Sequence, residues 1–340
     1  MPNEKKRVII SVNEIDKNNA GPKAKTDIDK ILKKEGFQVI NLRFNWHSKL
    51  LKFKYINWNI PRLMKNLQAD EIFFQFPTYS RALMNAFIRD IRAYTKAKLI
   101  LIIHDLESLR SYKDDPTYKP EEINWLKQVD GLIVHNNTMA KWIKDNGITT
   151  PMVILGLFDY LNPQSVNNNY QYTKTLCFAG NLKKAQFLSK VPAKISLDVY
   201  GPNFSGVTDN DVKYKGVYSP EELPAHLTEN FGLIWDGSSA EECNGMYGEY
   251  LQYNCPHKAS LYLSTGIPII VWNKAAIASI ISKNKLGYTI SSLYELPGLL
   301  SSITQSDFSL VKKNALSFSN DLRNGNHIKK AIANIEAIIW

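Results

Sequence analysis

The sequence is poor in cysteine, and its cysteines form no pattern typical of a metal site or a disulfide framework. Cys177, Cys243 and Cys255 are odd in number, widely spaced and outside any CxxC pair. Scattered single thiols of this kind predict reduced cysteines in a cytoplasmic protein. The six histidines show no metal-ligand spacing either. The sequence therefore predicts no bound metal and no other cofactor.

Long apolar runs and several familiar enzyme motifs are also lacking. No stretch reaches the roughly 18 apolar residues that a membrane span needs, and the polar start MPNEKKRV has no apolar region behind it, which predicts no signal peptide. Neither GxGxxG nor a Walker motif occurs, which argues against a dehydrogenase or a P-loop enzyme. No GxSxG or Cys–His nucleophile pattern stands out.

What the sequence has instead is an uneven excess of basic residues. The net charge is +10, and residues 1–100 hold 20 Lys and Arg against 9 Asp and Glu, a balance of +11. The other residues therefore sum to about zero. A basic surface on one part of a protein predicts an anionic partner, which is nucleic acid, an anionic membrane or a phosphorylated substrate.

Length and patterning predict two α/β domains. A chain of 340 residues suits two cores of about 150 residues each. Continuous Val, Ile and Leu runs at 7–12, 38–42, 71–76, 98–104, 131–135 and 152–155 alternate with helix-like stretches, which indicates a parallel sheet. A polar linker over 159–174 precedes a second series at 175–180, 195–201, 231–237, 267–272 and 286–290.

We therefore expect two Rossmann-like domains that face each other across a cleft. The first covers residues 1–165 and the second 166–310, and helices over 311–340 pack back toward the first domain. Ligands of such sheets bind outside the carboxyl ends of the strands, so the loops after the strands are the places to look for chemistry.

The first half has three such loops. The run GPKAK, residues 21–25, opens a helix with small residues and positive charge, which suits a phosphate or a closely approaching acceptor; a loop with solvated lysines is the alternative. A later strand ends in Pro77, Thr78 and Tyr79, where an aromatic ring can stack on a sugar or simply form an ordinary turn.

The sharpest pattern of the first half is IIHDLESLR, where a buried strand ends in His104 and Asp105. Carboxylates directly after a buried strand are candidate general bases, which here means Asp105 and Glu107. The alternative is structural: Asp105 caps a helix and Glu107 pairs with Arg110 at i, i+3.

In the second half, positive charge recurs where helices begin. Gly180 and Asn181 permit a tight turn before Lys183 and Lys184, which suits a diphosphate held by backbone N–H groups and an ammonium. The segment 231–271 holds still more candidate site residues. It contains Asp236, then Glu249 in a Gly-rich excursion, and then NCPHK.

The stretch NCPHK places a lysine where a helix dipole disfavours one. Asn254 is placed to cap the helix and Pro256 to begin it, since proline needs no N–H in a first turn. Lys258 then brings positive charge to an end that prefers negative charge. We expect a pyrophosphate to bind at this helix start, beside Lys258. The alternative is a surface lysine that extends along the helix.

The segment 42–65 mixes basic and aromatic residues. This composition suits a surface that faces anionic lipid headgroups, which would place the protein peripherally on the inner face of the membrane. It also suits single-stranded nucleic acid, although no RNP-type or zinc-finger signature supports nucleic acid as a partner. A strand-to-helix connection with a charged outer face is the third interpretation.

The motifs NAGPKAKTDI, IIHDLESLR, FAGNLKK, FGLIWDGSSAEECNGMYGEYL and NCPHKASLYLS together resemble a known family. They look like the bacterial β-1,6-galactofuranosyltransferases of O-antigen and capsule assembly, which have the GT-B fold. A more distant resemblance is to the glucosyltransferases that extend GlcNAc on streptococcal serine-rich adhesins. The similarity runs over most of the chain, and 231–264 is its most specific segment.

The resemblance implies a UDP-sugar donor in the C-terminal domain and a glycan acceptor, lipid-linked or protein-linked, in the N-terminal domain. Galactofuranose is the favoured hexose, and transfer of glucose from UDP-glucose to GlcNAc on an adhesin glycoprotein is the alternative. The adhesin relatives also imply a homo-oligomer.

Some roles come from matching residues to the family. Lys184 falls on a basic residue that contacts UDP, Tyr218 on an aromatic at the nucleotide, and Ala20 and Gly21 on a nucleotide-contacting loop. The nucleotide-binding helix start matches Pro256, His257, Lys258, Ala259 and Ser260. The paired glutamates that flank this helix in retaining GT-B enzymes are absent, so the stereochemical outcome does not carry over.

The implied reaction is substitution at the anomeric carbon with UDP as the leaving group. Lys184, Lys258 and the helix start would stabilise the departing diphosphate without a metal. If the enzyme inverts, Asp105 is the first candidate for the base and Glu107 the second. Asp236 and Glu249 are candidates for orienting the donor sugar. The acceptor-binding candidates are Lys23, Pro77, Thr78, Tyr79 and Arg110.

Overall fold

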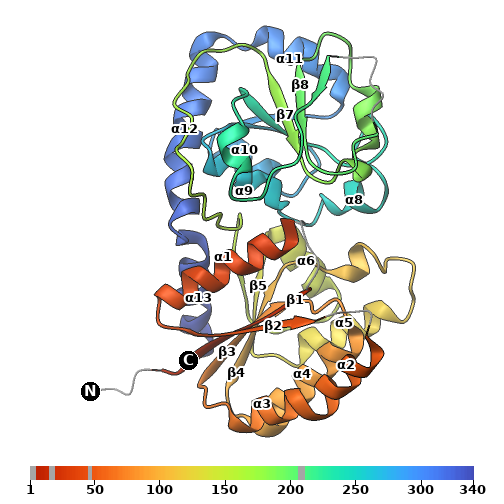
Figure 1. Cartoon of the computed structure of the whole chain (residues 1–340), viewed down its shortest axis with the longest axis vertical. Coiled ribbons are helices and arrows are strands. Elements are labelled where there is room, and N and C mark those ends of the chain that lie inside the picture. The colour runs from red at the N-terminus through yellow and green to blue at the C-terminus, as the bar shows by residue number, and fades with distance from the viewer. Residues whose placement is uncertain (1–4, 15–19, 45–47, 206–210) are drawn as a thin grey trace. The chain divides into compact units, whose positions relative to one another are not determined.

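The chain divides into two compact units (Figure 1). The computed structural model describes residues 5–14, 20–44, 48–205 and 211–340. Unit 1 comprises the chain up to Leu155 together with Ile328–Trp340, and unit 2 comprises Gly156–His327.

Unit 1 is built on a sheet of six parallel strands in the order β2-β1-β3-β4-β5-β6. Phe73 in the middle of β3 pairs with Ile9 of β1 and with Ile100 of β4. β3 is buried along its whole length, as expected for a continuous apolar run covered on both faces. The strands are β1 (Arg7–Glu14), β2 (Gln38–Phe44), β3 (Glu71–Phe76), β4 (Lys98–Ile103), β5 (Gly131–Val134) and β6 (Met152–Ile154).

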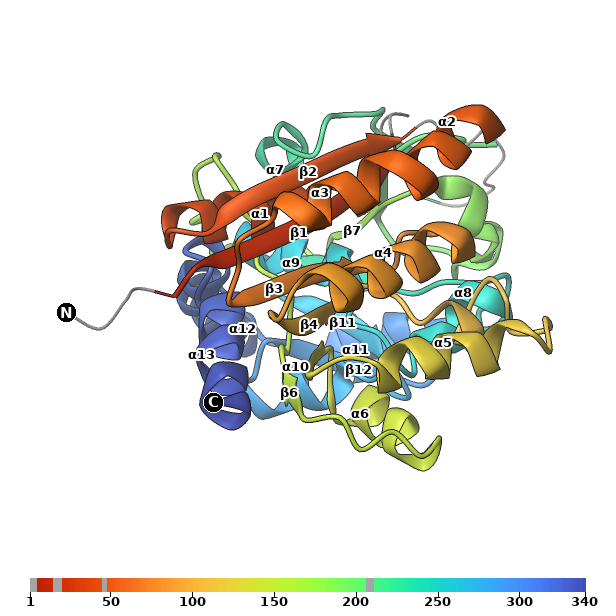
Figure 2. The same cartoon turned by 90° about the horizontal axis from the view of Figure 1, so that it is seen from below.

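Helices cover both faces of this sheet. α3 and α4 lie on one face, and α1 and α13 lie on the other (Figures 1 and 2). α13 contacts the sheet closely, because a Cβ added at Gly131 would meet Ile335. The helical elements are α1 (Ala20–Lys34), α2 (Lys49–Lys54), the π-helical turn η1 (Tyr55–Asn59), α3 (Ile60–Asn66), α4 (Arg81–Tyr94), the 3₁₀ turn η2 (Glu107–Leu109), α5 (Tyr118–Lys127), α6 (Asn137–Asp145) and α13 (Asn326–Ile339).

Unit 2 has a second sheet of six parallel strands, in the order β12-β11-β10-β7-β8-β9. Five of these strands coincide with predicted runs. The edge strand β9 was not predicted, because it is only three residues long and two of them are exposed, so it lacks an apolar run. The strands are β7 (Leu176–Ala179), β8 (Leu197–Tyr200), β9 (Val212–Tyr214), β10 (Phe231–Ile234), β11 (Ile269–Trp272) and β12 (Gly287–Ile290).

The helices of unit 2 are mostly short, apart from α12 near its end. They are the 3₁₀ turns η3 (Leu182–Lys184), η4 (Gln186–Lys190) and η5 (Leu293–Glu295), and the α-helices α7 (Leu223–His226), α8 (Gly245–Tyr250), α9 (His257–Ser264), α10 (Ala278–Lys283), α11 (Leu296–Ser302) and α12 (Gln305–Arg323). The capping box of Thr304 and Asp307 fixes where α12 begins.

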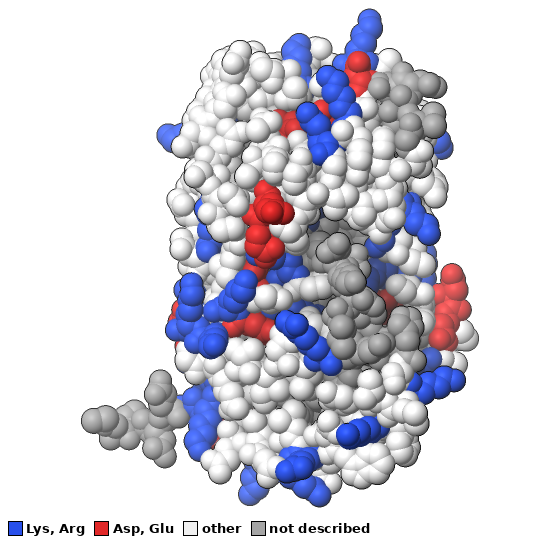
Figure 3. Space-filling model, viewed as in Figure 1, with Lys and Arg blue, Asp and Glu red and all other residues white. Residues whose placement is uncertain are grey.

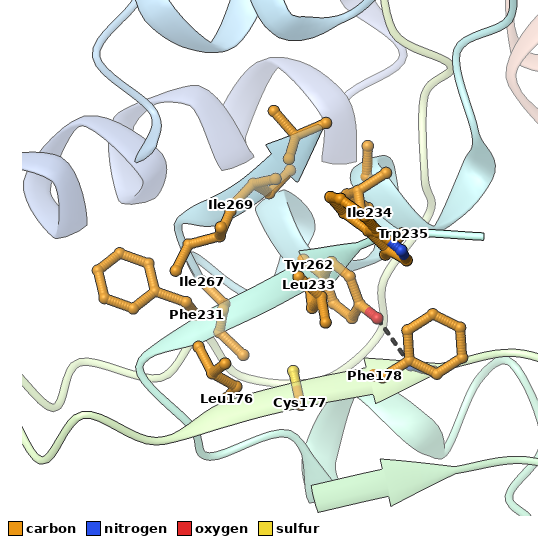
Figure 4. Close-up of a cluster of buried hydrophobic side chains, with 14 of the residues drawn as sticks. Leu176, Cys177, Phe178, Phe231, Leu233, Ile234, Trp235, Tyr262, Ile267 and Ile269 are labelled. Atoms are coloured by element: carbon orange, nitrogen blue, oxygen red, sulfur yellow. Dashed lines mark hydrogen bonds between the residues drawn. The ribbon is translucent and has the colours of Figure 1, made fainter. Parts of the chain in front are cut away.

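α9 is held against the sheet of unit 2 by one close contact. A Cβ at Gly232 of β10 would overlap the ring of Tyr262, so only glycine lets α9 approach this closely. The Tyr262 hydroxyl in turn accepts a hydrogen bond of 2.7 Å from the backbone N–H of Ala179. In Figure 4 the Tyr262 side chain lies beside β10, and its hydroxyl points toward the Phe178 end of β7. These contacts fix the position of the helix start.

The boundary between the units differs from the predicted one. Unit 1 ends at Leu155 rather than at 165, and the predicted linker 159–174 packs on unit 2. Tyr160 is buried there, and Asn162 donates to the backbone carbonyl of Ser264 at 3.2 Å. The polar composition of the segment suggested a linker, but Tyr160 is buried in the core of unit 2 and Tyr172 packs partly against it. α12 also belongs to unit 2, so only Ile328–Trp340 returns to unit 1.

The predicted pair of Rossmann-like domains is confirmed by two doubly wound parallel sheets. In unit 1 the strand order reverses between β1 and β3, and in unit 2 between β7 and β10. Such switch points are where ligands of open α/β sheets bind. Within the described ranges, none of the helices combines the length and apolar character required to cross a bilayer.

Candidate functional site

The switch point of unit 2 brings together the two loops that the sequence singled out there. Gly180 to Lys184 follow β7, and Trp235 to Gly237 follow β10. The start of α9 lies beside them, since Lys258 contacts residues of both β7 and the loop after β10. The predicted diphosphate positions of the second half are therefore next to the same pair of strands.

α9 begins at His257, one residue after the predicted start at Pro256, and its cap also differs from the prediction. Pro256 is the N-cap residue in extended conformation, and no side chain of the described residues caps the helix. Asn254, predicted to cap, lies too far ahead of the first helical residue, and its buried Oδ1 has no hydrogen-bond partner in the part of the chain that the structure describes. The prediction that Asn254 caps the helix is wrong, and Pro256 precedes the first turn rather than forming part of it.

The charge of Lys258 is balanced within unit 2. Its Nζ lies 2.9 and 3.0 Å from the two carboxylate oxygens of Asp236, 3.4 Å from the Trp235 carbonyl oxygen, and 4.5 Å from the centre of the Phe178 ring. We call Phe178, Asp236 and Lys258 the Lys258 cluster. Both charged side chains are only 15% exposed. The negative charge that the helix dipole favours at this end is therefore supplied by Asp236.

This pairing bears on how a diphosphate would bind. A lysine ammonium has three N–H donors, and those of Lys258 have three acceptors within reach, two on Asp236 and one on Trp235. An anion that binds at this point has to replace one of these acceptors at the Lys258 ammonium, and the nearby Asp236 carboxylate repels it. Among the described residues no side chain caps α9, and the Ala259 backbone N–H donates to the Pro256 carbonyl oxygen at 2.9 Å, so the helix start offers mainly the positive end of its dipole.

The loop after β7 depends on glycine. Gly180 has φ 153°, and a Cβ on Gly201, which follows β8, would overlap the Gly180 carbonyl oxygen. Asn181 then caps η3: its Oδ1 accepts from the Lys183 backbone N–H at 3.1 Å and from Asn203 Nδ2 at 2.9 Å. Lys183 and Lys184 thus enter a 3₁₀ turn and not an α-helix.

Lys184 is exposed and finds an aromatic partner that the sequence did not indicate. Its Nζ lies 3.9 Å from the centre of the Tyr247 ring, which comes from α8. A recess of about 350 Å³ lies beside the same loop, which is within the size range of ligand pockets. Its lining residues are Leu182, Lys183, Ala185, Gln186, Leu188, Ser189, Asn203, Phe204 and Ser205.

The Gly-rich loop after β10 packs tightly against Asp236. Gly237 has φ 112°, and the Ser238 backbone N–H donates to Asn244 Oδ1 at 2.8 Å. A Cβ on Gly248 would meet the Asp236 carbonyl oxygen. Glu249, the neighbour of Gly248 in α8, is half-buried. The glycines of this segment therefore serve to hold Asp236 in place.

The remaining predicted residues of unit 2 are mostly packed. His257 is half-buried, with its ring 5.0 Å from that of Tyr160. Ala259 and Ser260 are buried in the first turn of α9, and the Ser260 hydroxyl has no hydrogen-bond partner among the described residues. Tyr218 stacks on His226 at 3.7 Å between ring centres. Within the described residues, the ring contacts of Tyr218 are with His226 and Tyr200 and not with the Lys258 cluster.

The switch point of unit 1 holds a second polar group of residues. Tyr79 follows β3 and donates its hydroxyl to Asp105 Oδ2 at 2.8 Å. Arg110 lies 3.0 Å from Asp105 Oδ1 and also pairs with Glu107. Lys25 of α1 donates to the carbonyl oxygens of Val12 and Pro77, and its Nζ lies 5.1 Å from the centre of the Tyr79 ring. We call Lys25, Tyr79, Asp105, Glu107 and Arg110 the Asp105 cluster.

Burial sets the electrostatics of the Asp105 cluster. Desolvation lowers the pKa of Lys25 to about 8, although Asp105 and Asp29 oppose the shift. Desolvation also raises the pKa of Glu107, against the effect of Arg110. Tyr79 has φ 55°, a strained conformation for a non-glycine residue and one that is common at functional sites.

The two candidate bases differ in access. The Asp105 side chain is 13% exposed, whereas that of Glu107 is 2% exposed. Behind them, Glu122 of α5 accepts from the backbone N–H of Glu107 at 2.9 Å and from the Ser108 hydroxyl. Burial raises the pKa of Glu122 to about 7. The geometry thus favours Asp105 over Glu107 as the group that meets a ligand, and Asp105 is not a helix cap.

Of the two lysines in the run GPKAK, the acceptor-binding candidate Lys23 is not the one that lies in the Asp105 cluster. Lys23, predicted to bind the acceptor, is 5% exposed and pairs with Asp27 at 2.7 Å. Their i, i+4 spacing was a signal of this pairing. Lys25, which was not selected, is the lysine that belongs to the Asp105 cluster.

The other predicted residues of the first half have backbone or packing roles. The Pro77 carbonyl accepts from Lys25 at 2.9 Å, and buried Thr78 donates its hydroxyl to the Ser80 carbonyl oxygen at 2.9 Å. Ala20 and Gly21 lie in the first turn of α1. Among the described residues there is no group of three or more His, Cys, Asp and Glu that could hold a metal ion.

Comparisons with known proteins agree with this architecture. Residues 6–157 match the glucosyltransferase 3-like N-terminal domain, and residues 176–335 match the glucosyltransferase 3-like C-terminal domain. The chain is 30% identical over 245 residues to β-1,6-galactofuranosyltransferase WbbI of Escherichia coli K12, which covers 71% of this chain and 72% of that protein. It is 26% identical over 327 residues to glucosyltransferase 3 of Streptococcus gordonii, which covers 93% of each.

Solved structures share the fold at low sequence identity. Sucrose-phosphate synthase from Thermosynechococcus elongatus has a TM-score of 0.68 and 11% identity and covers 99% of both chains. The UDP-forming α,α-trehalose-phosphate synthase from Burkholderia xenovorans has a TM-score of 0.64 and 11% identity, over 97% of this chain and 100% of the other. With the fold and the matches to both domains, the chain belongs to the glucosyltransferase 3-like family of GT-B glycosyltransferases.

Proposed function

We propose that the enzyme transfers a hexose, galactofuranose in the first place, from a UDP-sugar to a sugar acceptor in surface polysaccharide assembly. The observation that carries the proposal is the start of α9, where Lys258 lies at the switch point of unit 2 and no side chain of the described residues caps the helix. The choice of galactofuranose rests on the 30% identity to a relative named β-1,6-galactofuranosyltransferase.

In this proposal unit 2 binds the nucleotide sugar. The diphosphate lies at the positive end of the α9 dipole and takes one donor of Lys258, and Lys184 adds a second positive charge. Donors that are already in place when charge develops on the leaving UDP lower the barrier. Asp236 balances the charge of Lys258, and Asp236 and Glu249 are the candidates for orienting the donor sugar.

No metal is assigned to this reaction, since the lysines and the helix start supply the positive charge that the leaving group needs. The test is transfer activity after exhaustive treatment with a chelator, compared with activity after adding back Mg²⁺ or Mn²⁺. We expect equal rates. A rate that depends on the added cation contradicts this part of the proposal.

Unit 1 is proposed to bind the acceptor and to supply the base. Asp105 accepts the proton of the attacking hydroxyl, and it retains acceptor capacity because each carboxylate oxygen can take two hydrogen bonds. Tyr79 and Arg110 hold the carboxylate in one orientation. Tyr79 is 44% exposed, so part of its ring is also available to a sugar.

A second function is favoured by the coverage of another relative. Glucosyltransferase 3 of Streptococcus gordonii matches 93% of this chain, more than the galactofuranosyltransferase does. The alternative is therefore a UDP-glucose-dependent glucosyltransferase that extends GlcNAc on a serine-rich adhesin glycoprotein.

A donor panel decides between these functions. UDP-galactofuranose, UDP-galactopyranose and UDP-glucose are each incubated with an α-glucoside and with a GlcNAc acceptor, and the product linkage is determined by NMR. Transfer from UDP-galactofuranose supports the first function, and transfer from UDP-glucose to GlcNAc supports the second. Absence of transfer from all three donors contradicts both.

A further inference from the structure

The consecutive helical elements α2, η1 and α3, which we call the α2–α3 segment (Lys49–Asn66), expose large apolar side chains. Leu50 is 83% exposed, Leu51 45%, Phe53 58% and Trp58 59%. Single exposed apolar residues are normal on a protein surface. Four of them within one short helical stretch are unusual for a surface that faces only water.

The core of unit 1 does not account for these residues. The inner side of the segment is formed by Ile60 and Met64, which are buried, and by Ile56 and Leu63, which pack against the same core. Neither α2 nor η1 has a buried residue. The fold therefore fixes the segment through its inner side and leaves the apolar outer side uncovered within the described residues.

The charge around this outer side has one sign. Between Glu35 and Asp70 the sequence has no Asp or Glu. Within the α2–α3 segment Lys49, Lys54, Arg62 and Lys65 are exposed. In the view of Figure 3, the visible surface over α3 shows blue Lys and Arg side chains and, among the described residues, no red ones. An apolar surface with basic residues beside it complements a bilayer that carries negative headgroups.

We propose that the α2–α3 segment binds the surface of a bilayer that contains anionic phospholipids. Leu50, Phe53 and Trp58 enter the boundary between headgroups and acyl chains, and the lysines and arginines contact lipid phosphates. Binding is peripheral and reversible. The proposal does not depend on which sugar the enzyme transfers, because it concerns the lipid surface alone.

The shape of the segment favours lipid over single-stranded nucleic acid. Proteins that bind single strands offer flat aromatic faces on which bases stack. Here the Phe53 and Trp58 rings meet edge to face, at 79° and 5.6 Å between centres. The most exposed side chain is Leu50, an aliphatic group that cannot stack on a base but suits an acyl boundary.

Vesicle flotation with the full chain tests the proposal. The protein is mixed with vesicles of pure phosphatidylcholine and with vesicles containing about one third phosphatidylglycerol, at about 0.05 M and about 0.5 M salt. We expect binding to the anionic vesicles at low salt, at least about tenfold weaker binding at high salt, and little binding to neutral vesicles.

Two variants separate the contributions of apolar and charged side chains. The triple variant Leu50→Ser, Phe53→Ser, Trp58→Ser and the triple variant Lys49→Gln, Lys54→Gln, Arg62→Gln should each weaken binding at least about tenfold. The matched controls alter exposed residues of unit 2: Leu310→Ser with Tyr294→Ser, and Lys283→Gln with Lys313→Gln. Circular dichroism and the melting temperature establish that each variant is folded.

The outcomes are decisive in both directions. Salt-sensitive binding to anionic vesicles that both triple variants lose and both controls keep supports the proposal. It is overturned if the folded wild type does not float with anionic vesicles, or if the triple variants bind as tightly as the controls. A dimer in sedimentation velocity that the apolar variant dissociates, without vesicle binding by the wild type, assigns the surface to a second copy instead.

Discussion

Replacing Lys258 is the most direct test of the proposed donor site. The Lys258→Met variant removes the ammonium but keeps an unbranched apolar stem that packs against the Phe178 ring. The variant therefore changes charge and hydrogen bonding more than packing. In the native chain the ammonium lies 2.9 Å from Asp236 Oδ1, and both side chains are largely buried.

The expected loss of affinity follows from the hydrogen bond that is removed. A hydrogen bond to a charged group contributes about 1.5–3 kcal/mol, and about 1.4 kcal/mol corresponds to a factor of ten. Lys258→Met should therefore weaken UDP binding about 10- to 150-fold. It also leaves the Asp236 carboxylate without its cation, which should lower the free energy of unfolding by about 1–3 kcal/mol.

Titration calorimetry with UDP measures the first effect, and urea unfolding measures the second. Lys274→Met serves as the matched control, because Lys274 is exposed and only 3.7 Å from the exposed Glu242. A surface pair of this kind contributes about 0–1 kcal/mol. Asp236→Asn provides the complement: it removes the negative charge near the diphosphate, so UDP affinity should stay equal or rise while stability falls.

Unchanged UDP affinity in a folded Lys258→Met variant would refute the reasoning. Lys258 would then be no more than the counter-ion of Asp236. A loss of affinity in Asp236→Asn as large as that in Lys258→Met would show instead that the carboxylate itself contacts the ligand.

Three further variants probe other parts of the molecule. Asp105→Asn should lower the turnover number about 10²- to 10⁴-fold with UDP affinity unchanged, measured by transfer kinetics and calorimetry; near-normal turnover contradicts the base assignment. Burial raises the pKa of Glu122 from 4.5 to about 7, so the native state binds the carboxyl proton more tightly than the unfolded chain does. The contribution of this proton to the free energy of unfolding is fully present below pH 4.5 and is lost as the pH rises to about 7. Glu122→Gln should make the decline of the melting temperature over this range shallower, and an identical slope contradicts the prediction. Gly232→Ala should cost about 1–3 kcal/mol of stability, because the new methyl group overlaps Tyr262; Gly298→Ala, which meets nothing within 4 Å, is the control, and equal melting temperatures contradict the close-contact argument.

Much of the backbone was predictable from local patterns. The helix predicted to begin at NCPHK is α9, His257–Ser264, and its limits are marked by Pro256 and by Thr265 with Gly266. The strands were recognisable as short apolar runs that a parallel sheet buries on both faces. β9 escaped prediction because an exposed edge strand of three residues has no such run.

The candidate sites were predictable in position but only partly in detail. A side chain after a parallel strand is bound to lie at the carboxyl edge of the sheet, so Asp105, Asp236 and Lys184 were found from order along the chain. The partners of these side chains come from elements distant in sequence. Tyr79 and Asp105 meet only because β3 and β4 are neighbours, and Tyr247 reaches Lys184 from α8.

Local patterns were enough to predict two Rossmann-like sheets with basic residues after their strands, because apolar runs and helix limits are local properties. The pairing of Asp236 with Lys258, the place of Lys25 rather than Lys23 beside Asp105, and the lack of a capping role for Asn254 depend on contacts between distant segments. An ammonium pairs with the carboxylate that lies nearest in space. That distance is set by strand order and by the close packing of α9 at Gly232, neither of which is written in any single stretch of the chain.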